Sequence, residues 1–271
     1  MKKTIILLCV TAMLLSLCAC FRPLPELKHE SKKETHEIAK PTESVSMTEE
    51  DTLPPTEETE ASWIAPELSE CIGLYTEASV NYSDGCYNDY NATYQVPEIL
   101  LDSSDAKRAN DMIQAHCNES IDDSLQAEMD KVSLFCFGIS YDAWIYDHYL
   151  SLVIFEQNDW DCNYYMVFTF DLMTGRWLGN KEYAEYLSMD ESALFETIRS
   201  SLLYHFDDMN SAMPDEYKDE FFNEQREGQY SDDNVKETEL YIGRDGSVQM
   251  CCWVKSIAGA DAYMHLLPLI K

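Results

Sequence analysis

The sequence predicts an α+β domain with a largely antiparallel sheet and two main packed helices, preceded by a signal peptide and a disordered linker. Three observations predict this class. Apolar residues recur at helical spacing over 103–117 and 188–206. Runs rich in β-branched and aromatic residues lie between and after these segments. An Asp-Gly pair separates the last two runs, which is typical of a tight hairpin. Helix, meander, helix and hairpin in this order indicate the α+β class.

The first 19 residues have the order of a secretory signal, with two lysines before an apolar run over 5–17. That run is shorter than the about 20 residues of a spanning helix, so an uncleaved membrane anchor is the less favoured alternative. Leu17-Cys18-Ala19-Cys20 closes the run and resembles the lipobox of bacterial lipoproteins. A small residue precedes Cys20, whereas a bulky leucine precedes Cys18. We therefore expect Cys20 to carry the lipid anchor, for example palmitate, and the protein to sit on the cell membrane facing outside the cytoplasm.

Composition divides the rest of the chain in two. Residues 20–61 are rich in Glu, Thr, Pro, Ser and Lys, with too little apolar surface to offset chain entropy, so an acidic disordered linker is predicted. Aromatic and aliphatic residues appear from Trp63 onward. Residues 62–271 are therefore expected to form a single globular domain. Within it, 209–234 is polar enough to predict a long mobile excursion.

The first helix is predicted over 103–117, with Asp102, Ser103 and Ser104 as candidate N-caps. Five of its residues share one helical face, namely Ala106, Ala109, Ile113, His116 and Cys117.

Three strands are predicted next, over 134–141, 149–155 and 164–172. The polar segment 156–163 reads as the hairpin loop between the last two. Gly175 can supply the positive φ of the turn that follows them.

The second helix is predicted to begin at Ser188, with Glu191 completing a capping box. Its apolar face consists of Leu194, Phe195, Ile198, Leu202 and Phe206. A final hairpin is predicted from 239–243 and 248–254. Strand alternation places Val248, Met250, Cys252 and Val254 on one of its faces.

The formal net charge is −31. Such a charge disfavours nucleic acid as a partner, because nucleic-acid binding needs a basic surface. It favours cationic partners through electrostatic steering. The simpler alternative is that acidity only keeps a surface protein soluble.

Seven cysteines follow Cys20, an odd number that leaves at least one thiol outside any internal disulfide. No C-x-x-C pair indicates zinc. Most are expected to be buried, small apolar residues, with one or two disulfides among them. They are Cys71, Cys86, Cys117, Cys136, Cys162, Cys251 and Cys252; the last two are adjacent in a predicted strand and should point to opposite faces.

Several of these residues resemble a bacterial extracytoplasmic domain of unknown function. The likeness rests on Pro97-Glu98-Ile99, on Ala106 and Asn110, on Phe170-Asp171-Leu172-Met173-Thr174-Gly175-Arg176 and on the capped second helix. The closing segment 241–267, with Ser256-Ile257-Ala258-Gly259-Ala260-Asp261, is similar to the C-terminal half of that family and of Gram-positive lipoproteins.

That domain occurs in a lysozyme-sensing anti-sigma factor and N-terminal to a peptidoglycan deacetylase. The resemblance covers about residues 90–271 and implies an α+β fold in a cell-envelope setting, without catalytic residues. It does not extend to a sigma-binding segment or a deacetylase domain, so neither activity is implied.

No catalytic, metal or cofactor residues are predicted, because the six histidines lack ligand spacing and no nucleophile elbow occurs. His116 adjoins Cys117, but helical neighbours do not face each other, so a packed or partly exposed histidine is expected. The acids of 81–91 favour an acidic loop over a calcium site. Candidate ligand contacts lie on two predicted loops, where exposed aromatic residues could stack on sugars or anchor a protein; core packing is the alternative. These are Trp144, Tyr146, Trp160 and Asp161.

These observations favour a lipid-anchored binding or sensing module of the cell envelope, whose ligand is a cationic secreted protein or a cell-wall glycan. Two alternatives stay open. One is an envelope-acting enzyme, which would bring acids or a Cys/His pair together in one pocket. The other is a structural or assembly lipoprotein, which would expose a large apolar patch.

Overall fold

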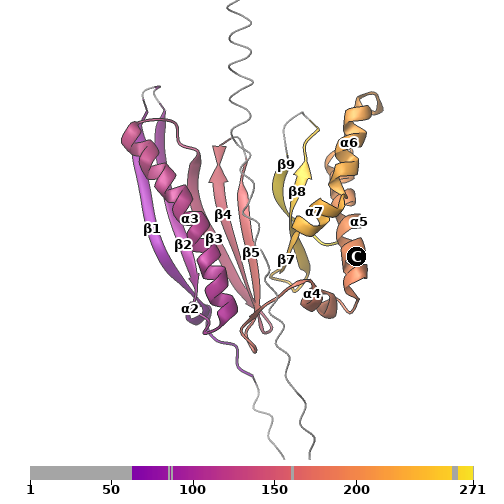
Figure 1. Ribbon diagram of the computed structural model, residues 1–271, viewed down its shortest axis with the longest axis horizontal. Coiled ribbons are helices and arrows are strands. Elements are labelled where there is room, and N and C mark those ends of the chain that lie inside the picture. The colour runs from indigo at the N-terminus through magenta and orange to yellow at the C-terminus, as the bar shows by residue number, and fades with distance from the viewer. Residues whose placement is uncertain (1–62, 85, 87, 160–161, 258–261, 271) are drawn as a thin grey trace, which may run out of the picture. The chain divides into compact units, whose positions relative to one another are not determined.

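The computed structural model describes residues 63–270, except 85, 87, 160, 161 and 258–261. These residues form an α+β domain with two sheets, and helices cover the outer face of each sheet (Figure 1). The predicted α+β class is therefore confirmed. The predicted signal peptide, the linker and Cys20 lie outside the described residues.

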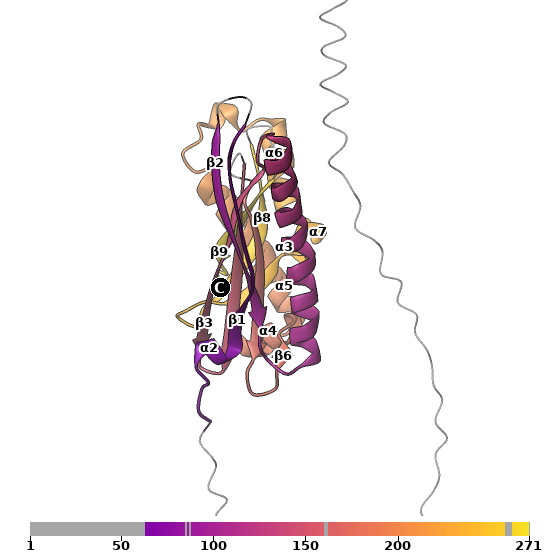
Figure 2. The ribbon, with the colours of Figure 1, turned by 90° about the vertical axis from the view of Figure 1, so that its left-hand side faces the viewer.

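The large sheet has six strands, and neighbouring strands are antiparallel except β2 and β3. These two are parallel because the helix α3 (Ser104–Asp130) connects them across one face of the sheet. Figure 2 shows α3 running along this face. The short helix α2 (Leu68–Cys71) precedes the sheet. The strands are β1 (Ile72–Ser83), β2 (Asp89–Ile99), β3 (Cys136–Tyr146), β4 (Tyr149–Asn158), β5 (Tyr164–Asp171) and β6 (Arg176–Trp177).

The parallel pairing of β2 and β3 depends on a glycine. Thr93 pairs with Gly138, and Tyr94 pairs with Ile139. A Cβ atom on Gly138 would lie 2.9 Å from the carbonyl oxygen of Thr93. Only glycine lets the two backbones approach this closely without a shift of the strand.

The small sheet contains the three antiparallel strands β7 (Glu239–Ile242), β8 (Val248–Lys255) and β9 (Ala262–Pro268). Four α-helices and a 3-10 turn form the layer around it. They are α4 (Asn180–Tyr186), α5 (Glu191–Met209), η2 (Asp215–Tyr217), α6 (Glu220–Gln229) and α7 (Asp232–Glu237).

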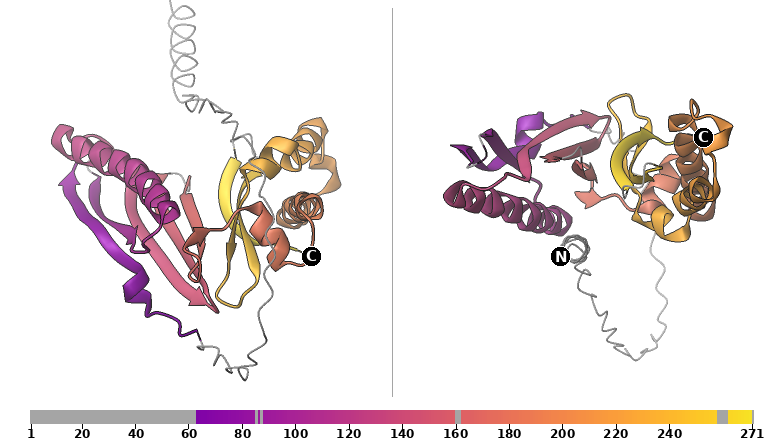
Figure 3. Two further views of the ribbon diagram at one scale, coloured as in Figure 1. Left: turned by 60° about the horizontal axis from the view of Figure 1, so that its bottom comes forward. Right: turned by 90° about the horizontal axis from the view of Figure 1, so that it is seen from above.

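Figure 3 shows α3, the large sheet, the small sheet and its helices as successive layers. Among the described residues, three apolar cores fill the spaces between these layers. The large-sheet core lies between α3 and the large sheet and includes Ile113 and Phe168. The inter-sheet core joins the two sheets around Val153 and Val167. The small-sheet core lies between the small sheet and its helices. In β8, alternate side chains point to the same face of the strand, as predicted. This buried face consists of Val248, Met250, Cys252 and Val254, which all belong to the small-sheet core.

Several predicted boundaries are wrong. Helix α3 continues to Asp130 because Ile121 and Ser124 extend its buried face beyond Cys117. Its N-cap is Ser103, which is one of the three predicted candidates. The Ser103 hydroxyl accepts a hydrogen bond from the Ala106 N–H.

Helix α5 does not begin with a capping box at Ser188. Asp190 is its N-cap, and the Asp190 carboxylate accepts a hydrogen bond from the Ala193 N–H. The predicted excursion over 209–234 is also wrong, because η2, α6 and the start of α7 occupy it. Phe222 of α6 packs against Phe206 of α5, with ring centres 5.5 Å apart.

The hairpin of β1 and β2 was not predicted. Only one face of each strand is buried, against α3, and the other face carries polar residues such as Glu77, Asn81 and Asn91. Asn81 and Asn91 pair across the two strands, so the acidic loop expected over 81–91 is confined to the turn between them. Among the described residues, none of the helices has the length and apolar character to cross a membrane.

Candidate functional site

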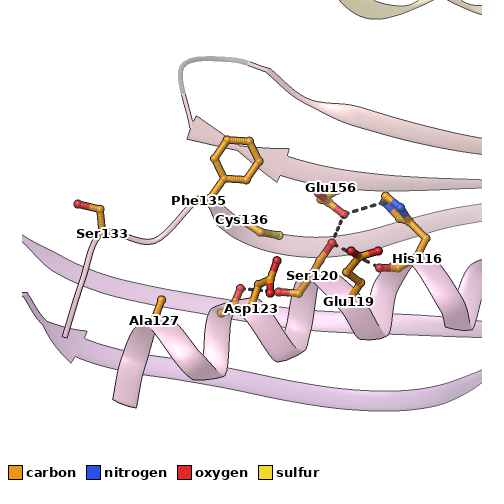
Figure 4. A pocket seen from close by; sticks show the side chains of 10 residues that line it. His116, Glu119, Ser120, Asp123, Ala127, Ser133, Phe135, Cys136 and Glu156 are labelled. Atoms are coloured by element: carbon orange, nitrogen blue, oxygen red, sulfur yellow. Dashed lines mark hydrogen bonds and ion pairs between the residues drawn. The ribbon is translucent and has the colours of Figure 1, made fainter. Parts of the chain in front are cut away.

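A cavity of about 240 Å³ lies between the second half of α3 and the strands β3 and β4 (Figure 4). We call it the α3 cavity. Its residues come from three separate segments of the chain. They are His116, Glu119, Ser120, Asp123, Ser124 and Ala127 of α3, Ser133, Phe135 and Cys136 around the start of β3, and Glu156 of β4.

Glu156 is the buried acid of this cavity, with 6% of its surface exposed. Strand alternation places it there, because Leu152 and Ile154 face α3 and Glu156 is the next residue on the same face. The polar character of 156–163 predicted a hairpin loop that included Glu156, but β4 continues to Asn158. If the predicted strand is continued by one more residue, the alternation of its side chains places the Glu156 carboxylate on the buried face.

Two side chains from α3 hold the Glu156 carboxylate. His116 Nε2 lies 2.9 Å from it, and the Ser120 hydroxyl donates a hydrogen bond of 2.8 Å. Figure 4 shows His116, Ser120 and Glu156 pointing toward one another. His116 and Ser120 are four residues apart and thus lie on one face of the helix. His116 is partly exposed, as predicted, while Cys117 is buried in the core.

This environment keeps Glu156 ionised. Burial by itself would raise the pKa of Glu156, because a charged group loses solvation in the interior. Close polar contacts with His116, Asn158 and Ser120, together with the positive charge that a protonated His116 brings, outweigh burial and lower the pKa. The floor of the cavity therefore carries a negative charge at neutral pH.

Two polar atoms beside Glu156 make no hydrogen bond within the described structure, His116 Nε2 and Asn158 Oδ1. The contact of His116 with Glu156 is an ion pair by distance, but its direction does not satisfy hydrogen-bond geometry. Asn158 is 8% exposed. Buried polar atoms are nearly always paired. His116 Nε2 has the Glu156 carboxylate as its charged neighbour, and Asn158 does not line the cavity.

The rim of the cavity adds negative charge and one aromatic ring. Glu119 and Asp123 line it and are exposed, and Phe135 has 62% of its surface exposed. The lining contains no lysine or arginine. The last turn of α3 carries no basic residue either, and the C-cap Lys131 that follows it places its ammonium over the Tyr82 ring and does not line the cavity. This arrangement attracts a cation.

Nucleophilic catalysis is not favoured, although Cys136 and His116 line the same cavity. Burial and the charge of Glu156 raise the pKa of the Cys136 thiol to about 12, and the thiolate is the nucleophilic form. The Ser120 hydroxyl donates to Glu156 and not to a histidine base. The groups converge, but their geometry suits holding an ion better than forming a covalent intermediate.

Of the four candidate ligand contacts, Trp144 and Tyr146 are described. Both belong to β3, so their predicted loop location is wrong. Trp144 packs against the inter-sheet core, and its indole N–H donates a 3.0 Å hydrogen bond to the Ile242 carbonyl. The Tyr146 ring covers Gly246 in the turn between β7 and β8, and 37% of Tyr146 is exposed. Trp160 and Asp161 lie outside the described residues.

The turn between β1 and β2 is organised by Asp84. The Asp84 carboxylate accepts hydrogen bonds from the Cys86 and Asn88 N–H groups, the Asn88 side chain and the Tyr90 hydroxyl. These bonds, first those from Asn88, lower the pKa of Asp84 to about 2. In the described part of the chain, no three His, Cys, Asp or Glu side chains are grouped to hold a metal.

No disulfide joins the described cysteines to one another, so the expected one or two bridges are not found there. Cys251 belongs to the inter-sheet core and Cys252 to the small-sheet core, which confirms that they point to opposite faces. Cys86 and Cys162 are exposed. The buried thiols are Cys71, Cys117, Cys136, Cys251 and Cys252.

No known family model matches the chain, and no curated protein matches it. The resemblance to the extracytoplasmic domain therefore rests on the residues quoted for it in the sequence.

Proposed function

We propose that this chain is a lipid-anchored extracytoplasmic binding module of the bacterial cell envelope, and that the α3 cavity receives a cationic group of its ligand. A lysine or arginine side chain of a secreted basic protein has the required chemistry. The observation that carries the proposal is the ionised carboxylate of Glu156, nearly buried beneath a rim of Glu119 and Asp123.

The charges around the cavity support this ligand over a neutral one. A buried carboxylate interacts more strongly with a cation than a solvated one does, because less water screens it. The exposed Phe135 at the rim supplies an aromatic surface for an alkyl stem or a guanidinium plane. The net charge of −31 would speed the approach of a basic protein from solution.

The membrane location rests on the lipobox-like Leu17-Cys18-Ala19-Cys20 and on the cell-envelope setting that the resemblance implies. Intact-mass analysis of the protein extracted from its membrane checks this part. We expect a chain that starts at Cys20 and carries acyl groups. An unmodified chain that starts at Met1 would refute the anchor.

Binding of lysozyme, used as a basic probe, to the immobilised full chain tests the ligand. We expect affinity to fall steeply between about 20 and 300 mM salt, because the attraction is electrostatic. The double variant Glu119→Gln/Asp123→Asn should bind about tenfold more weakly, the effect of losing about 1.4 kcal/mol.

The matched control is Glu216→Gln/Glu224→Gln, which removes two exposed charges outside the cavity. It should bind nearly as the unmodified chain does. Equal losses in both variants would mean that lysozyme senses only net charge. Absence of binding at low salt would exclude a basic protein as the ligand.

A further inference from the structure

A second cavity, of about 310 Å³, lies where β6 and the start of α4 meet α7 and β7. We call it the β7 cavity. Its walls come from segments that are far apart in the sequence, with Arg108 of α3, Trp177 of β6, and Lys236 and Glu239 on either side of the α7–β7 junction. A volume of this order suits a small molecule.

Two cations line this cavity, in a chain with 19 basic and 50 acidic residues. The Arg108 guanidinium lies over the Trp177 ring, 5.0 Å from its centre, and 3.3 Å from Asp105. Stacking fixes the guanidinium plane but leaves N–H donors at its edge. Lys236 makes no ion pair within the described part of the chain.

Glu239 supplies the opposite charge in the same cavity. It shares its face of β7 with Tyr241, which belongs to the inter-sheet core, so its carboxylate lies at the margin of that core. It forms no ion pair with a described residue, and the residue as a whole is exposed at the cavity. Loss of solvation at its carboxylate, partly offset by a hydrogen bond from the Val167 N–H, raises the pKa of Glu239, so an added cation would stabilise its charged form.

The walls around these groups are held by internal hydrogen bonds. The buried Tyr183 hydroxyl donates a 2.6 Å bond to the Leu240 carbonyl, and the Thr238 hydroxyl donates a 2.8 Å bond to the Asn234 carbonyl. The first bond ties α4 to β7, and the second closes the last turn of α7 directly before β7. The backbone that carries Lys236 and Glu239 is therefore held in place, which lowers the entropy cost of binding.

We infer that the β7 cavity binds a small zwitterion, an α-amino acid or a dipeptide, with its carboxylate at Arg108 and Lys236 and its ammonium group at Glu239. An anion without an amino group would be repelled by the carboxylate of Glu239. A cation without a carboxylate would be repelled by the positive charges of Arg108 and Lys236. A zwitterion satisfies both signs of charge. This site is separate from the α3 cavity and does not depend on the function proposed for it.

Calorimetric titration of the full chain tests the inference. The probes are each of the twenty L-amino acids and glycylglycine, up to about 10 mM. For a probe that binds, its amide lacks the carboxylate and its N-acetyl derivative lacks the ammonium group. We expect each derivative to bind at least about tenfold more weakly than the zwitterion.

Lys236→Met should weaken zwitterion binding by a similar factor. It keeps the aliphatic stem of an exposed residue, so the fold should be preserved. Lys255→Met is the matched control, since Lys255 also makes no ion pair with a described residue and does not line the cavity. Glu239→Gln should restore binding of the N-acetyl derivative relative to the zwitterion.

Failure of every probe to bind would overturn the inference. So would equal binding by the unmodified chain and Lys236→Met. If the N-acetyl derivative bound the unmodified chain as tightly as the zwitterion, the cavity would be a carboxylate site and the assignment to Glu239 would be wrong.

Discussion

His116 Nε2 of α3 lies 2.9 Å from the carboxylate of Glu156 of β4, and this contact joins the helix to the large sheet at the floor of the α3 cavity. The residues that prepare the cavity for a cation are thus also part of the packing of α3. Stability and binding can be separated experimentally, because the rim acids are exposed and Glu156 is buried.

Replacing Glu156 by glutamine should destabilise the fold by about 1–3 kcal/mol, because His116 loses its charged partner and buried polar groups lose theirs. Urea unfolding at pH 7 measures the difference. Glu119→Gln is the control, since an exposed substitution should change stability by less than about 0.5 kcal/mol. Equal stability of Glu156→Gln and the unmodified protein would show that the ion pair contributes nothing net to the fold.

Stability should fall in acid, and Glu156 should account for part of the fall. The folded pKa of Glu156 is below its usual value of 4.5, so the unfolded chain binds the proton more tightly. The stabilisation is complete above that value and is lost as the pH falls through the folded pKa. Thermal unfolding from pH 7 to 3 should therefore show a weaker dependence in Glu156→Gln.

Protonation of Asp84 should also lower the stability of the fold, but at a lower pH than protonation of Glu156. Its folded pKa is about 2, against an ordinary value of 3.8, so its contribution is lost as the pH falls from about 4 toward 2. Asp84→Asn should flatten this part of the curve. Parallel pH profiles for Asp84→Asn and the unmodified protein would contradict the hydrogen-bonded turn as the source.

Trp144→Phe should lower the free energy of unfolding by about 1 kcal/mol. Phenylalanine keeps an aromatic ring at the junction of the two sheets, but the hydrogen bond from the indole N–H to the Ile242 carbonyl is lost. Ser151 also donates to that carbonyl, at 2.8 Å, and should keep it from being wholly unpaired. The double variant Trp144→Phe/Ser151→Ala should therefore lose more stability than the sum of the single variants. Simple additivity in chemical unfolding would count against a shared acceptor.

The buried thiols should resist alkylation until the protein unfolds. Burial raises the pKa of Cys117, Cys136 and Cys252 to about 12, so almost no thiolate is present at neutral pH. Exposed Cys86 should react first. Pulse labelling with iodoacetamide followed by peptide mass spectrometry gives the order, and early labelling of Cys117 or Cys252 would contradict the packing of either core.

Local pattern in the sequence determined the class of the fold and the faces of its elements. The helical spacing of Ala106, Ala109 and Ile113 predicted the buried face of α3, and alternation predicted the buried face of β8. Gly175 adopts the positive φ, 70°, that its turn required. These features depend on neighbours within a few residues, which is why periodicity detects them.

Only the tertiary structure decided which charged and polar side chains come together in the two cavities. Glu156 and His116 are 40 residues apart, and Arg108, Trp177 and Glu239 are farther apart still, so no spacing in the sequence predicts either cavity. The division into two sheets and the β1–β2 hairpin were also missed, because strand pairing is set by contacts between distant segments. The sequence by itself determined the charge, the lipobox-like segment and the amphipathic elements. Packing of α3 and of β7 against the large sheet decided which charges meet, since only a folded chain holds distant side chains together against their conformational entropy.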